Sequence, residues 1–329
     1  IAMDVLITGG TGFLGSHLCE YFLEKKASVG ILTRRQASTA VKPSMFGLLK
    51  LSDRVEQIPC ELENFAQVRE LMAQHQPHVV VHLAAVADVN QSRQMPLQTF
   101  NASATGLLNI AEAVRQLELE TRIVNHITDK VYFANPIPFV EDMPFHTGTI
   151  YEIAKQSQDQ LGAFYGKYYG LRIINVRCGN FFGAFDFDFN RIVPYVNRQI
   201  FLDEPIVLRS DGTMTRDFLY IKDAVRLHDQ VLNALDRNEH LGEAFNFSNE
   251  IKRDVLSIVE EIAALHGHTD QVILEPTASQ EIPDMTLSCA KAHKVLGWKP
   301  HYPFADALAE TCNGYLDNFQ RFRREILGA

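Results

Sequence analysis

The sequence lacks the patterns that build disulfide or metal frameworks. Its five cysteines are scattered and odd in number, and no pair of them forms Cys-x-x-Cys. None of its twelve histidines stands in a His-Glu-x-x-His motif. His75, His78 and His82 fall at a helix end and on a predicted strand, where three ligands would not converge. We therefore expect neither a disulfide framework nor a metal site.

Basic clusters and long apolar runs are also missing. The chain carries 31 Lys and Arg against 40 Asp and Glu, a formal net charge of −9, and has no run of cationic residues. This balance argues against nucleic acid as a partner. No uninterrupted apolar stretch reaches the roughly 18 residues of a membrane span, and the chain starts like a strand rather than a secretion signal. These absences predict a cytoplasmic protein with no membrane partner.

What the sequence does have is a globular composition with a regular alternation. Apolar residues make up 46% and charged residues 22% of its 329 positions, which is typical of a globular chain of about two domains. Short apolar runs alternate with helical periodicity, in which Leu14, Leu18 and Phe22 share one helix face. The predicted strands are Asp4–Thr8, Ser28–Leu32, Arg54–Ile58, His78–Leu83, Arg122–Ile127, Leu171–Val176 and Ala244–Phe247.

This alternation predicts an α/β fold with a Rossmann-like doubly wound parallel sheet that is covered on both faces. After Gly183 the alternation breaks, and the chain ends with predicted helices at Val255–Leu265 and Phe304–Phe319. We therefore predict a dinucleotide-binding domain from residues 3–182 plus about 216–248. A smaller mixed α/β substrate lobe is predicted from 183–215 plus about 249–329.

A glycine-rich stretch follows the first predicted strand and opens the first predicted helix. Gly9 suits a tight turn, Gly12 lets the backbone approach a pyrophosphate, and Gly15 allows the helix to pack closely against the strand. The helix N-terminus adds free N–H groups and a partial positive charge. A glycine motif alone is weak evidence, but its place between strand and helix indicates dinucleotide binding. The predicted cofactor contacts here are Gly9, Thr11, Gly12, Phe13, Leu14 and Gly15.

The end of the second predicted strand lacks the acidic residue that NAD-binding units carry about 20 residues past the glycines. It reads Thr33-Arg34-Arg35 instead. Two guanidinium groups would attract a ribose 2′-phosphate and gain nothing from a bare hydroxyl, so we expect NADP in preference to NAD. The alternative is that Arg34 and Arg35 are solvated surface charges. After the third strand, Glu61 and Leu62 are candidates to flank the adenine.

Tyr151 and Lys155 stand four residues apart, on one face of a predicted helix. A nearby ammonium, aided by an oxidised nicotinamide, would lower the pKa of the phenol from about 10 toward neutrality. Tyr151 could then take a proton from a substrate hydroxyl. The same spacing arises by chance in many helices, but this helix follows the fifth strand, where the nicotinamide end of a dinucleotide should lie.

Three consecutive polar residues, Thr128, Asp129 and Lys130, end the fifth predicted strand. Side chains at the carboxyl edge of a parallel sheet face the crevice where ligands bind. The alternative for these three residues is ordinary turn chemistry. After the fourth strand, Asp88 and Asn90 offer partners for sugar hydroxyls.

Further motifs continue this pattern along the chain. They are His82-Leu83-Ala84-Ala85, Asn101, Arg177-Cys178-Gly179-Asn180 with Gly183, Gly212, Arg216-Asp217-Phe218, Tyr220 and Asp223. Together with the glycine motif and the Tyr151–Lys155 pair, they resemble the extended short-chain dehydrogenase/reductases that act on nucleotide sugars. The resemblance runs from Met3 to Leu296-Gly297-Trp298-Lys299-Pro300, which is almost the whole chain.

The triplet after the fifth strand narrows the resemblance. Thr128-Asp129-Lys130 is similar to the Thr-Asp-Glu of dTDP-glucose 4,6-dehydratases and closer still to the Ser/Thr-Asp-Lys of CDP-glucose 4,6-dehydratases, whereas 4-epimerases carry no acid there. The resemblance implies that Tyr151 removes the C4 hydroxyl proton while a hydride passes to the cofactor. Lys155 would hold the nicotinamide ribose, Thr128 would bond the reacting oxygen, and Asp129 would protonate the departing C6 hydroxyl. The hydride then returns to C6 and leaves a 4-keto-6-deoxyhexose.

Three roles stay open for Lys130. It could remove the C5 proton, if burial and nearby cations lower its pKa from a reference value near 10.4. It could instead steady an enolate oxygen, or pair with Asp129. The nucleotide base also stays open, because the stretch before Phe218 has the general sugar-nucleotide pattern and not the Arg-Pro-Trp form of CDP-glucose dehydratases.

The resemblance assigns the remaining contacts. Ala84 and Ala85 would meet the cofactor, and a nucleotide-diphosphate hexose is the implied substrate. The predicted substrate contacts are Asp88, Asn90, Asn180, Arg191 and Arg216, although Arg216 and Asp217 could instead form a local ion pair. The helices carrying Leu107 and Leu161 would form a homodimer face, unless both residues are intramolecular core.

Two other functions compete with the dehydratase. A nucleotide-sugar 4-epimerase or reductase would share Tyr151 and Lys155 and leave Asp129 idle. A non-catalytic NAD(P)-sensing protein on the same fold is the alternative of another class, because fold does not fix function.

Overall fold

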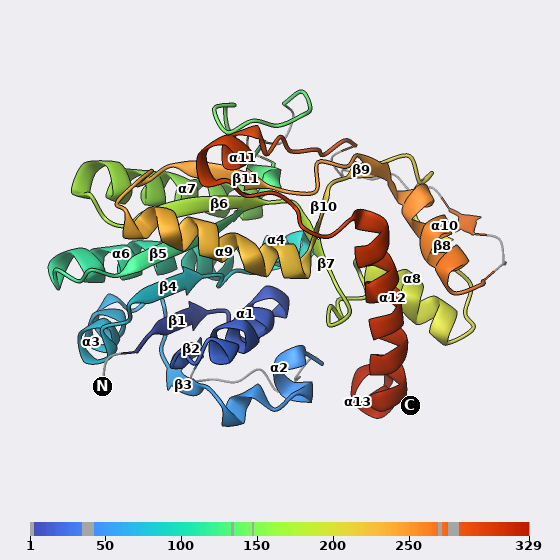
Figure 1. The fold of residues 1–329 in the computed structure, drawn as a ribbon, viewed down its shortest axis with the longest axis horizontal. Coiled ribbons are helices and arrows are strands. Elements are labelled where there is room, and N and C mark those ends of the chain that lie inside the picture. Colours follow the sequence, from blue (N-terminus) through green and yellow to red (C-terminus); the bar gives the residue numbers. More distant parts are fainter. Residues whose placement is uncertain are drawn as a thin grey trace.

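The computed structural model describes residues 3–34, 43–132, 135–146, 148–268, 272–275 and 283–328. Its centre is a parallel sheet of seven strands in the order β11-β6-β5-β4-β1-β2-β3 (Figure 1). The strands span Val5–Thr8 (β1), Val29–Thr33 (β2), Glu56–Pro59 (β3), Val79–His82 (β4), Arg122–Thr128 (β5), Ile173–Cys178 (β6) and Ala244–Phe247 (β11). Each predicted strand is therefore present, with shifts of at most two residues at its ends.

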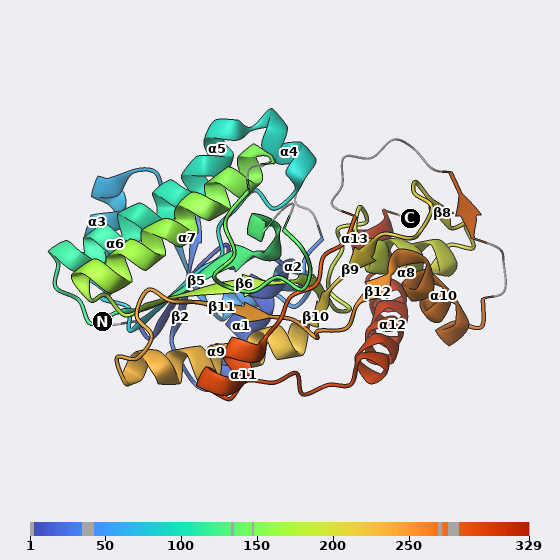
Figure 2. The ribbon, with the colours of Figure 1, turned by 90° about the horizontal axis from the view of Figure 1, so that it is seen from above.

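Helices cover both faces of this sheet, as Figure 2 shows. On one face lie α3 (Phe65–His75), α6 (Gly106–Gln116) and α7 (Ile150–Tyr169), and on the other α1 (Phe13–Glu24) and α9 (Ile221–Asp236). The predicted doubly wound α/β fold is confirmed. The apolar faces pack inward as the periodicity indicates, since Leu14, Leu18 and Phe22 are all buried beneath α1.

The strand order reverses between β1 and β4, because β1 pairs with β2 on one side and with β4 on the other. In open α/β sheets, ligands bind in the crevice outside the carboxyl ends of the strands at such a point. Short elements follow the strand ends here: α4 (Val89–Gln94), α5 (Pro96–Phe100), the π-helical η2 (Asn101–Thr105) and the 3₁₀ turn η3 (Asp129–Tyr132). Near β2 and β3 lie α2 (Met45–Leu48) and η1 (Leu51–Asp53).

A second group of elements lies beside the carboxyl ends of the strands, on the right in Figures 1 and 2. Its helices are α8 (Ile192–Phe201), α10 (Val255–Leu265), α12 (Phe304–Arg321) and α13 (Arg323–Leu327), and α8 packs against α10 and α12. Short strand pairs join β8 (Val207–Leu208) to β13 (Ile273–Leu274), β9 (Thr215–Arg216) to β12 (Arg253–Asp254), and β7 (Asn180–Phe182) to β10 (Phe218–Tyr220). The predicted helices at 255–265 and 304–319 are present.

One element departs from the expected division of the chain. The helix α11 (Ala290–Leu296) lies in the stretch assigned to the substrate lobe, yet it packs against β11 and α9 of the central sheet. The chain after residue 249 thus returns to the sheet before it forms α12. The boundaries of the two domains stay a prediction.

The helices α6 and α7 also decide the place of Leu107 and Leu161. Leu107 is fully buried, and Leu161 packs against the same core cluster. Both residues therefore belong to the intramolecular core, as the alternative interpretation had it.

Within these described ranges, no helix combines the length and the apolar character needed to cross a membrane. The same residues hold no group of three or more His, Cys, Asp or Glu side chains that could bind a metal ion.

Candidate active site

The loop between β1 and α1 is shaped for a bound group that approaches the backbone closely. Gly9 has φ +72°, the left-handed region that favours glycine, and a Cβ there would lie 3.1 Å from the amide nitrogen of Ala84. A Cβ at Gly15 would lie 2.3 Å from the carbonyl oxygen of Gly9. Gly12 is the N-cap of α1, and its helix has no side-chain cap. The first turn of α1 therefore keeps N–H groups for an anion, and the loop fits the pyrophosphate of a dinucleotide.

A hydrogen-bond network connects the end of β1 to the segment after β4. The hydroxyl oxygen of Thr8 accepts hydrogen bonds from the amides of Leu83 and Ala84, both at 3.0 Å. Its own hydrogen is left for His82 Nδ1 at 2.8 Å, and His82 Nε2 then donates to the Ser103 carbonyl at 2.9 Å. Burial lowers the pKa of His82 to about 4, so the ring is neutral at pH 7. This hydrogen-bond network places Ala84 and Ala85 beside the glycine loop.

The other predicted cofactor contacts differ in their exposure and surroundings. Arg34 is exposed directly after β2, while Arg35 lies outside the described residues. Glu61 is half-buried after β3. Leu62 is only 9% exposed and packs in the core with α3 and α6. Its side chain thus packs in the core, and its contact with adenine stays a prediction.

The start of α7 sets the position of the tyrosine. Thr149 and Glu152 form a capping box, in which the Thr149 hydroxyl accepts from the amide of Tyr151 and the Glu152 carboxylate accepts from the amide of Thr149. This fixes Tyr151 in the first turn of the helix. Tyr151 and Lys155 are 8% and 4% exposed, one turn apart.

The polar residues after β5 gather around this tyrosine. The Thr128 hydroxyl donates to Asp129 Oδ1 at 3.2 Å and lies close enough to the phenol of Tyr151 to act on its pKa. Lys130 Nζ lies 5.7 Å from the centre of the Tyr151 ring. Asp129 Oδ2 is buried and has no hydrogen-bond partner among the described residues. The structure therefore brings Thr128, Asp129, Lys130 and Tyr151 together.

Burial dominates the electrostatics of this cluster. It raises the pKa of Asp129 to about 6, against the opposing charges of Lys130 and Arg216. It also raises the pKa of Tyr151 to about 12, although the neighbouring Thr128 hydroxyl acts in the other direction. Asp129 can therefore hold a proton nearly to neutral pH. In the protein alone the phenol is therefore not activated, because burial outweighs the groups that lower its pKa; the lowering by Lys155 together with an oxidised nicotinamide stays a prediction.

The Lys155 ammonium is hydrogen-bonded to groups other than the phenol. Its Nζ donates to the His126 carbonyl at 2.9 Å and to Gln158 Oε1 at 3.0 Å. Burial lowers the pKa of Lys155 to about 7. The part of the prediction that places Lys155 one turn below Tyr151 agrees with the structure, while its contact with Gln158 carried no signal in the sequence.

A buried ion pair holds the turn η3 in place. Arg177 donates from Nε and Nη2 to the two carboxylate oxygens of Asp159, each at 2.8 Å. Arg177 Nη1 donates to the Tyr132 hydroxyl at 2.6 Å, and that hydroxyl donates to Asn246 Oδ1 at 2.8 Å. Tyr132 ends the turn that begins at Asp129. The network therefore fixes the polar triplet to β6, α7 and β11.

Two predicted substrate contacts carry positive charge toward the cluster. Arg191, the N-cap of α8, lowers the pKa of Tyr151 through its charge, and its Nη1 pairs with Asp186 Oδ2 at 3.0 Å. Arg216 on β9 acts in the same way on Asp129. Its neighbour Asp217 is fully buried and accepts a hydrogen bond from the amide of Leu287 at 2.9 Å. Burial raises the pKa of Asp217 to about 7.

The remaining substrate candidates have less direct positions. Asn180 is half-buried at the start of β7, where its amide donates to the Asp217 carbonyl at 3.0 Å. Asp88 caps α4 by accepting from the amide of Gln91 at 2.7 Å. Asn90 is exposed in the first turn of that helix. One carboxylate oxygen of Asp88 therefore caps the helix α4.

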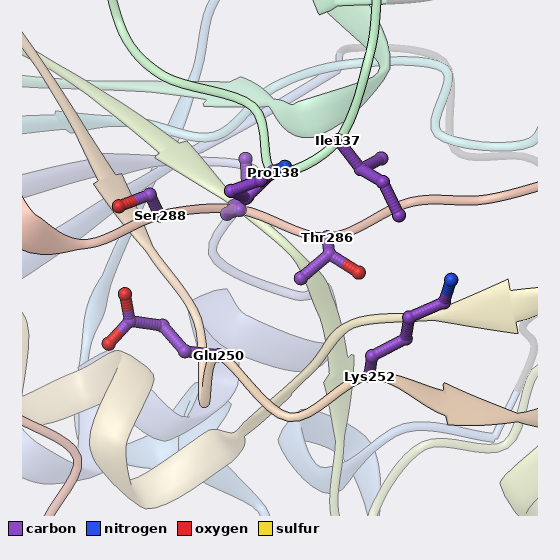
Figure 3. Close-up of a pocket in the computed structure, with 7 residues that line it drawn as sticks. Ile137, Pro138, Glu250, Lys252, Thr286 and Ser288 are labelled. Carbon is purple, nitrogen blue, oxygen red and sulfur yellow. The ribbon is translucent and has the colours of Figure 1, made fainter.

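A pocket lies apart from these residues, between the loop after η3 and the segment that precedes α11 (Figure 3). Its two charged side chains have partners in the protein: Glu250 accepts from the amide of Cys289 at 2.7 Å, and Lys252 lies 3.3 Å from Asp284. None of the predicted site residues lines it. The lining consists of Ile137, Pro138, Glu250, Lys252, Thr286, Leu287 and Ser288.

Comparison with known proteins gives a family match over most of the chain. The model of the NAD dependent epimerase/dehydratase family matches residues 5–247. The dTDP-glucose 4,6-dehydratase of Xanthomonas campestris pv. campestris (strain B100) is 26% identical, over 95% of this chain and 93% of that protein. The CDP-glucose 4,6-dehydratase of Salmonella typhimurium (strain LT2) is 25% identical, over 92% of this chain and 88% of that protein.

Solved structures share the fold. The UDP-glucose 4-epimerase of Thermotoga maritima, solved with UDP-glucose, superposes with a TM-score of 0.85 at 23% identity, covering 97% of this chain and 100% of that one. The dTDP-glucose 4,6-dehydratase of Bacillus anthracis, solved with NAD, gives a TM-score of 0.83 at 22% identity, covering 98% and 100%. At these identities the likeness establishes the fold alone, which dehydratases and epimerases have in common.

Proposed function

Because the chain belongs to the NAD dependent epimerase/dehydratase family, we propose that it is a nucleotide-sugar 4,6-dehydratase. The observation that carries this proposal is Asp129, a buried carboxyl whose pKa is raised to about 6 and which lies with Thr128 beside Tyr151. An acid in that place has a use when water leaves the sugar and has none in an epimerase. The names of the dTDP- and CDP-glucose 4,6-dehydratase relatives agree with this choice.

Each residue of the cluster then has a defined task. The nicotinamide of a dinucleotide held by the glycine loop would supply the acceptor for the C4 hydride and its later source for C6. Tyr151 accepts the proton of the C4 hydroxyl, with Thr128 hydrogen-bonded to the same oxygen. Asp129 gives its proton to the departing C6 hydroxyl. Lys130, which lies over the Tyr151 ring, either removes the C5 proton or steadies the negative charge that develops on the C4 oxygen.

The same geometry indicates which residues would hold the cofactor and the substrate. The glycine loop and the first turn of α1 would hold the cofactor pyrophosphate, with Ala84 and Ala85 alongside. Lys155 would hold the nicotinamide ribose. Arg191 and Arg216 bring the positive charge that a sugar-nucleotide diphosphate needs. Asn180, at the start of β7, would be a further contact to the substrate.

A panel of nucleotide sugars tests the function. We expect at least one of CDP-, dTDP-, GDP- and UDP-hexose to yield a 4-keto-6-deoxy product, measured by its ultraviolet absorbance in alkali. A C4 epimer without any 4-ketose would contradict the dehydratase and favour an epimerase. Cofactor binding without turnover of any sugar would favour the sensing protein.

We also propose NADP as the preferred cofactor, on the cationic end of β2. Replacing Arg34 and Arg35 by Ala should weaken NADP by about tenfold or more, because a hydrogen bond to a charged group contributes about 1.5–3 kcal/mol. The affinity for NAD should change far less. Fluorescence titration of both reduced cofactors measures the difference, and Arg34→Ala alone reports on the described residue. Equal losses for both cofactors would remove the case for a bound 2′-phosphate.

A homodimer stays part of the proposal. The helices α6 and α7 expose Leu108, Ile153, Phe164 and Tyr168, and the rings of Phe164 and Tyr168 stack with their centres 5.2 Å apart. Exposed aromatic and aliphatic side chains on neighbouring helices are typical of a contact surface.

A further inference from the structure

We propose that Gln158 is a positioning residue that holds the Lys155 ammonium at the end of a one-directional chain of three buried amides. The inference rests on the proposed function only for the task of Lys155. The chain itself is defined by contacts among α7, β5 and β6, and none of its three amides stands in the motifs that the sequence singled out.

The contacts form an unbroken series. Lys155 Nζ donates to Gln158 Oε1 at 3.0 Å, and Gln158 Nε2 donates to Asn125 Oδ1 at 2.6 Å. Asn125 Nδ2 donates to Asn175 Oδ1 at 2.8 Å, and Asn175 Nδ2 donates to the Asp159 carbonyl at 2.8 Å. Gln158, Asn125 and Asn175 are completely buried. The series therefore leaves α7 at Gln158, crosses β5 and β6, and returns to the backbone of α7 at Asp159.

The two ends of the series fix its direction. An ammonium can only donate, and the Asp159 carbonyl can only accept, so each amide between them must present its oxygen toward Lys155. Side contacts support the same orientation: Gln158 Nε2 also donates to the His126 carbonyl at 3.1 Å, and Asn125 Nδ2 to the Gln158 carbonyl at 3.3 Å. The three amide dipoles are thereby aligned. Aligned hydrogen bonds polarise one another, which makes Gln158 Oε1 a stronger acceptor.

The backbone of α7 makes room for the series. A Cβ at Gly162 would lie 2.2 Å from Asn175 Oδ1 and 2.9 Å from Asn125 Nδ2. Any side chain there would push the helix off the amides. The glycine is thus explained by the close approach of α7 to β5 and β6.

Lys155 depends on these acceptors. Among the residues that the structure describes, its ammonium donates to the His126 carbonyl and to Gln158, and burial alone lowers its pKa to about 7. A buried ammonium without acceptors would lose its proton. Two acceptors and one remaining N–H also give the ammonium a direction, which is what a ligand to the nicotinamide ribose requires.

Few other groups near Lys155 titrate around neutral pH. His82 on β4 and His126 on β5 face it, and burial lowers the pKa of both rings, so they stay neutral. His228 on α9 lies beyond His126, with 3.0 Å between their Nε2 atoms, and its pKa is lowered as well. Tyr151 lies one turn above on α7, flanked by Asp129 and Lys130 of η3. Of these groups, Asp129, with a pKa of about 6, is the one whose titration comes closest to that of Lys155.

Two substitutions at Gln158 separate the proposal from a packing role. Gln158→Met keeps the length and removes the acceptor, so the pKa of Lys155 should fall by about one unit or more. Gln158→Glu places a carboxyl group against Nζ; once Asn125 turns its Nδ2 toward the second carboxylate oxygen, which replaces the donor Nε2, the ionised group should raise that pKa. The readout is the ¹³Cε and ¹⁵Nζ shift of Lys155 in lysine-labelled protein without substrate, assigned by the signal lost in Lys155→Arg. A packing role would not move this value in opposite directions.

Gln156→Met is the matched control. Gln156 lies on the same helix and is buried, but its amide donates to the carbonyls of Val131 and His146 and not to the lysine. Its substitution should leave the pKa of Lys155 in place. Asn175→Ser cuts the far end of the series without touching Lys155, and should lower that pKa by less than Gln158→Met does. This variant keeps the test open if Gln158→Met does not fold.

The outcomes decide between the possibilities. Equal values in the wild type and both Gln158 variants, or shifts of the same sign, would overturn the proposal. Because the measurement needs no turnover, it stands even if the protein dehydrates none of the sugars. If the function holds, loss of the Lys155 proton should add a second alkaline fall in the dehydration rate, separate from the fall that belongs to Asp129, and this second fall should move with the pKa of Lys155 in each variant.

Discussion

The Asp129→Asn variant is expected to lose about 10²–10⁴-fold in the rate of dehydration while it keeps its cofactor, which is the range for removal of a general acid. The substitution preserves the shape of the side chain and the hydrogen bond that it accepts from Thr128. It removes the proton that the departing C6 hydroxyl needs. Oxidation at C4 does not use that proton, so reduced nicotinamide should still appear and can be followed by its absorbance.

The pH dependence of the wild type gives the same residue a second test. Burial raises the pKa of Asp129 to about 6, and the reaction needs the protonated form. The dehydration rate should therefore fall as the pH rises through that value, and the Asp129→Asn variant should lack this limb.

Asp223→Asn is a suitable control for this variant. Asp223 is also a buried carboxylate, but it accepts hydrogen bonds from the amides of His301 and Tyr302, away from the cluster. Its substitution should leave the rate per folded molecule unchanged. Unchanged turnover in Asp129→Asn would contradict the assignment of Asp129 as the general acid.

The sequence was sufficient for those parts of the fold whose signals are local. The seven strands of the sheet follow from apolar runs, and the glycine loop from its place between a strand and a helix. The pairing of Tyr151 with Lys155 needs only the period of a helix. The triplet at 128–130 needs only the end of a strand, because the sheet itself brings that end to the crevice.

The parts that could not be predicted depend on contacts between distant residues. Asn125 and Asn175 are 50 residues apart in the chain, and each looks like a polar interruption of an apolar strand. Asp159 and Arg177 are charges that a surface could equally carry, until the fold buries both of them together. Leu62 shows the reverse case, since a leucine after a strand contacts a ligand or the core according to the helix above it.

The Tyr151→Phe variant should slow the reaction one step earlier than Asp129→Asn does. Phe cannot accept the C4 proton, so we expect a loss of about 10²–10⁴-fold in both nicotinamide reduction and 4-ketose formation. Burial holds the phenol's pKa at about 12 in the protein alone, so the wild-type base works only where cations offset that burial. The size of the rate loss in Tyr151→Phe therefore shows how far cations lower the pKa of the phenol in the wild-type enzyme.

Tyr165→Phe supplies the comparison for this effect. Tyr165 lies on the same helix and is buried, and its hydroxyl donates to Glu112 at 2.9 Å, on the side of α7 that faces α6. It should retain its activity. If Tyr151→Phe also retained most of the wild-type rate, the proton would have to leave through another group. Lys130 would then be the first candidate, because its Nζ lies 5.7 Å from the centre of the same ring.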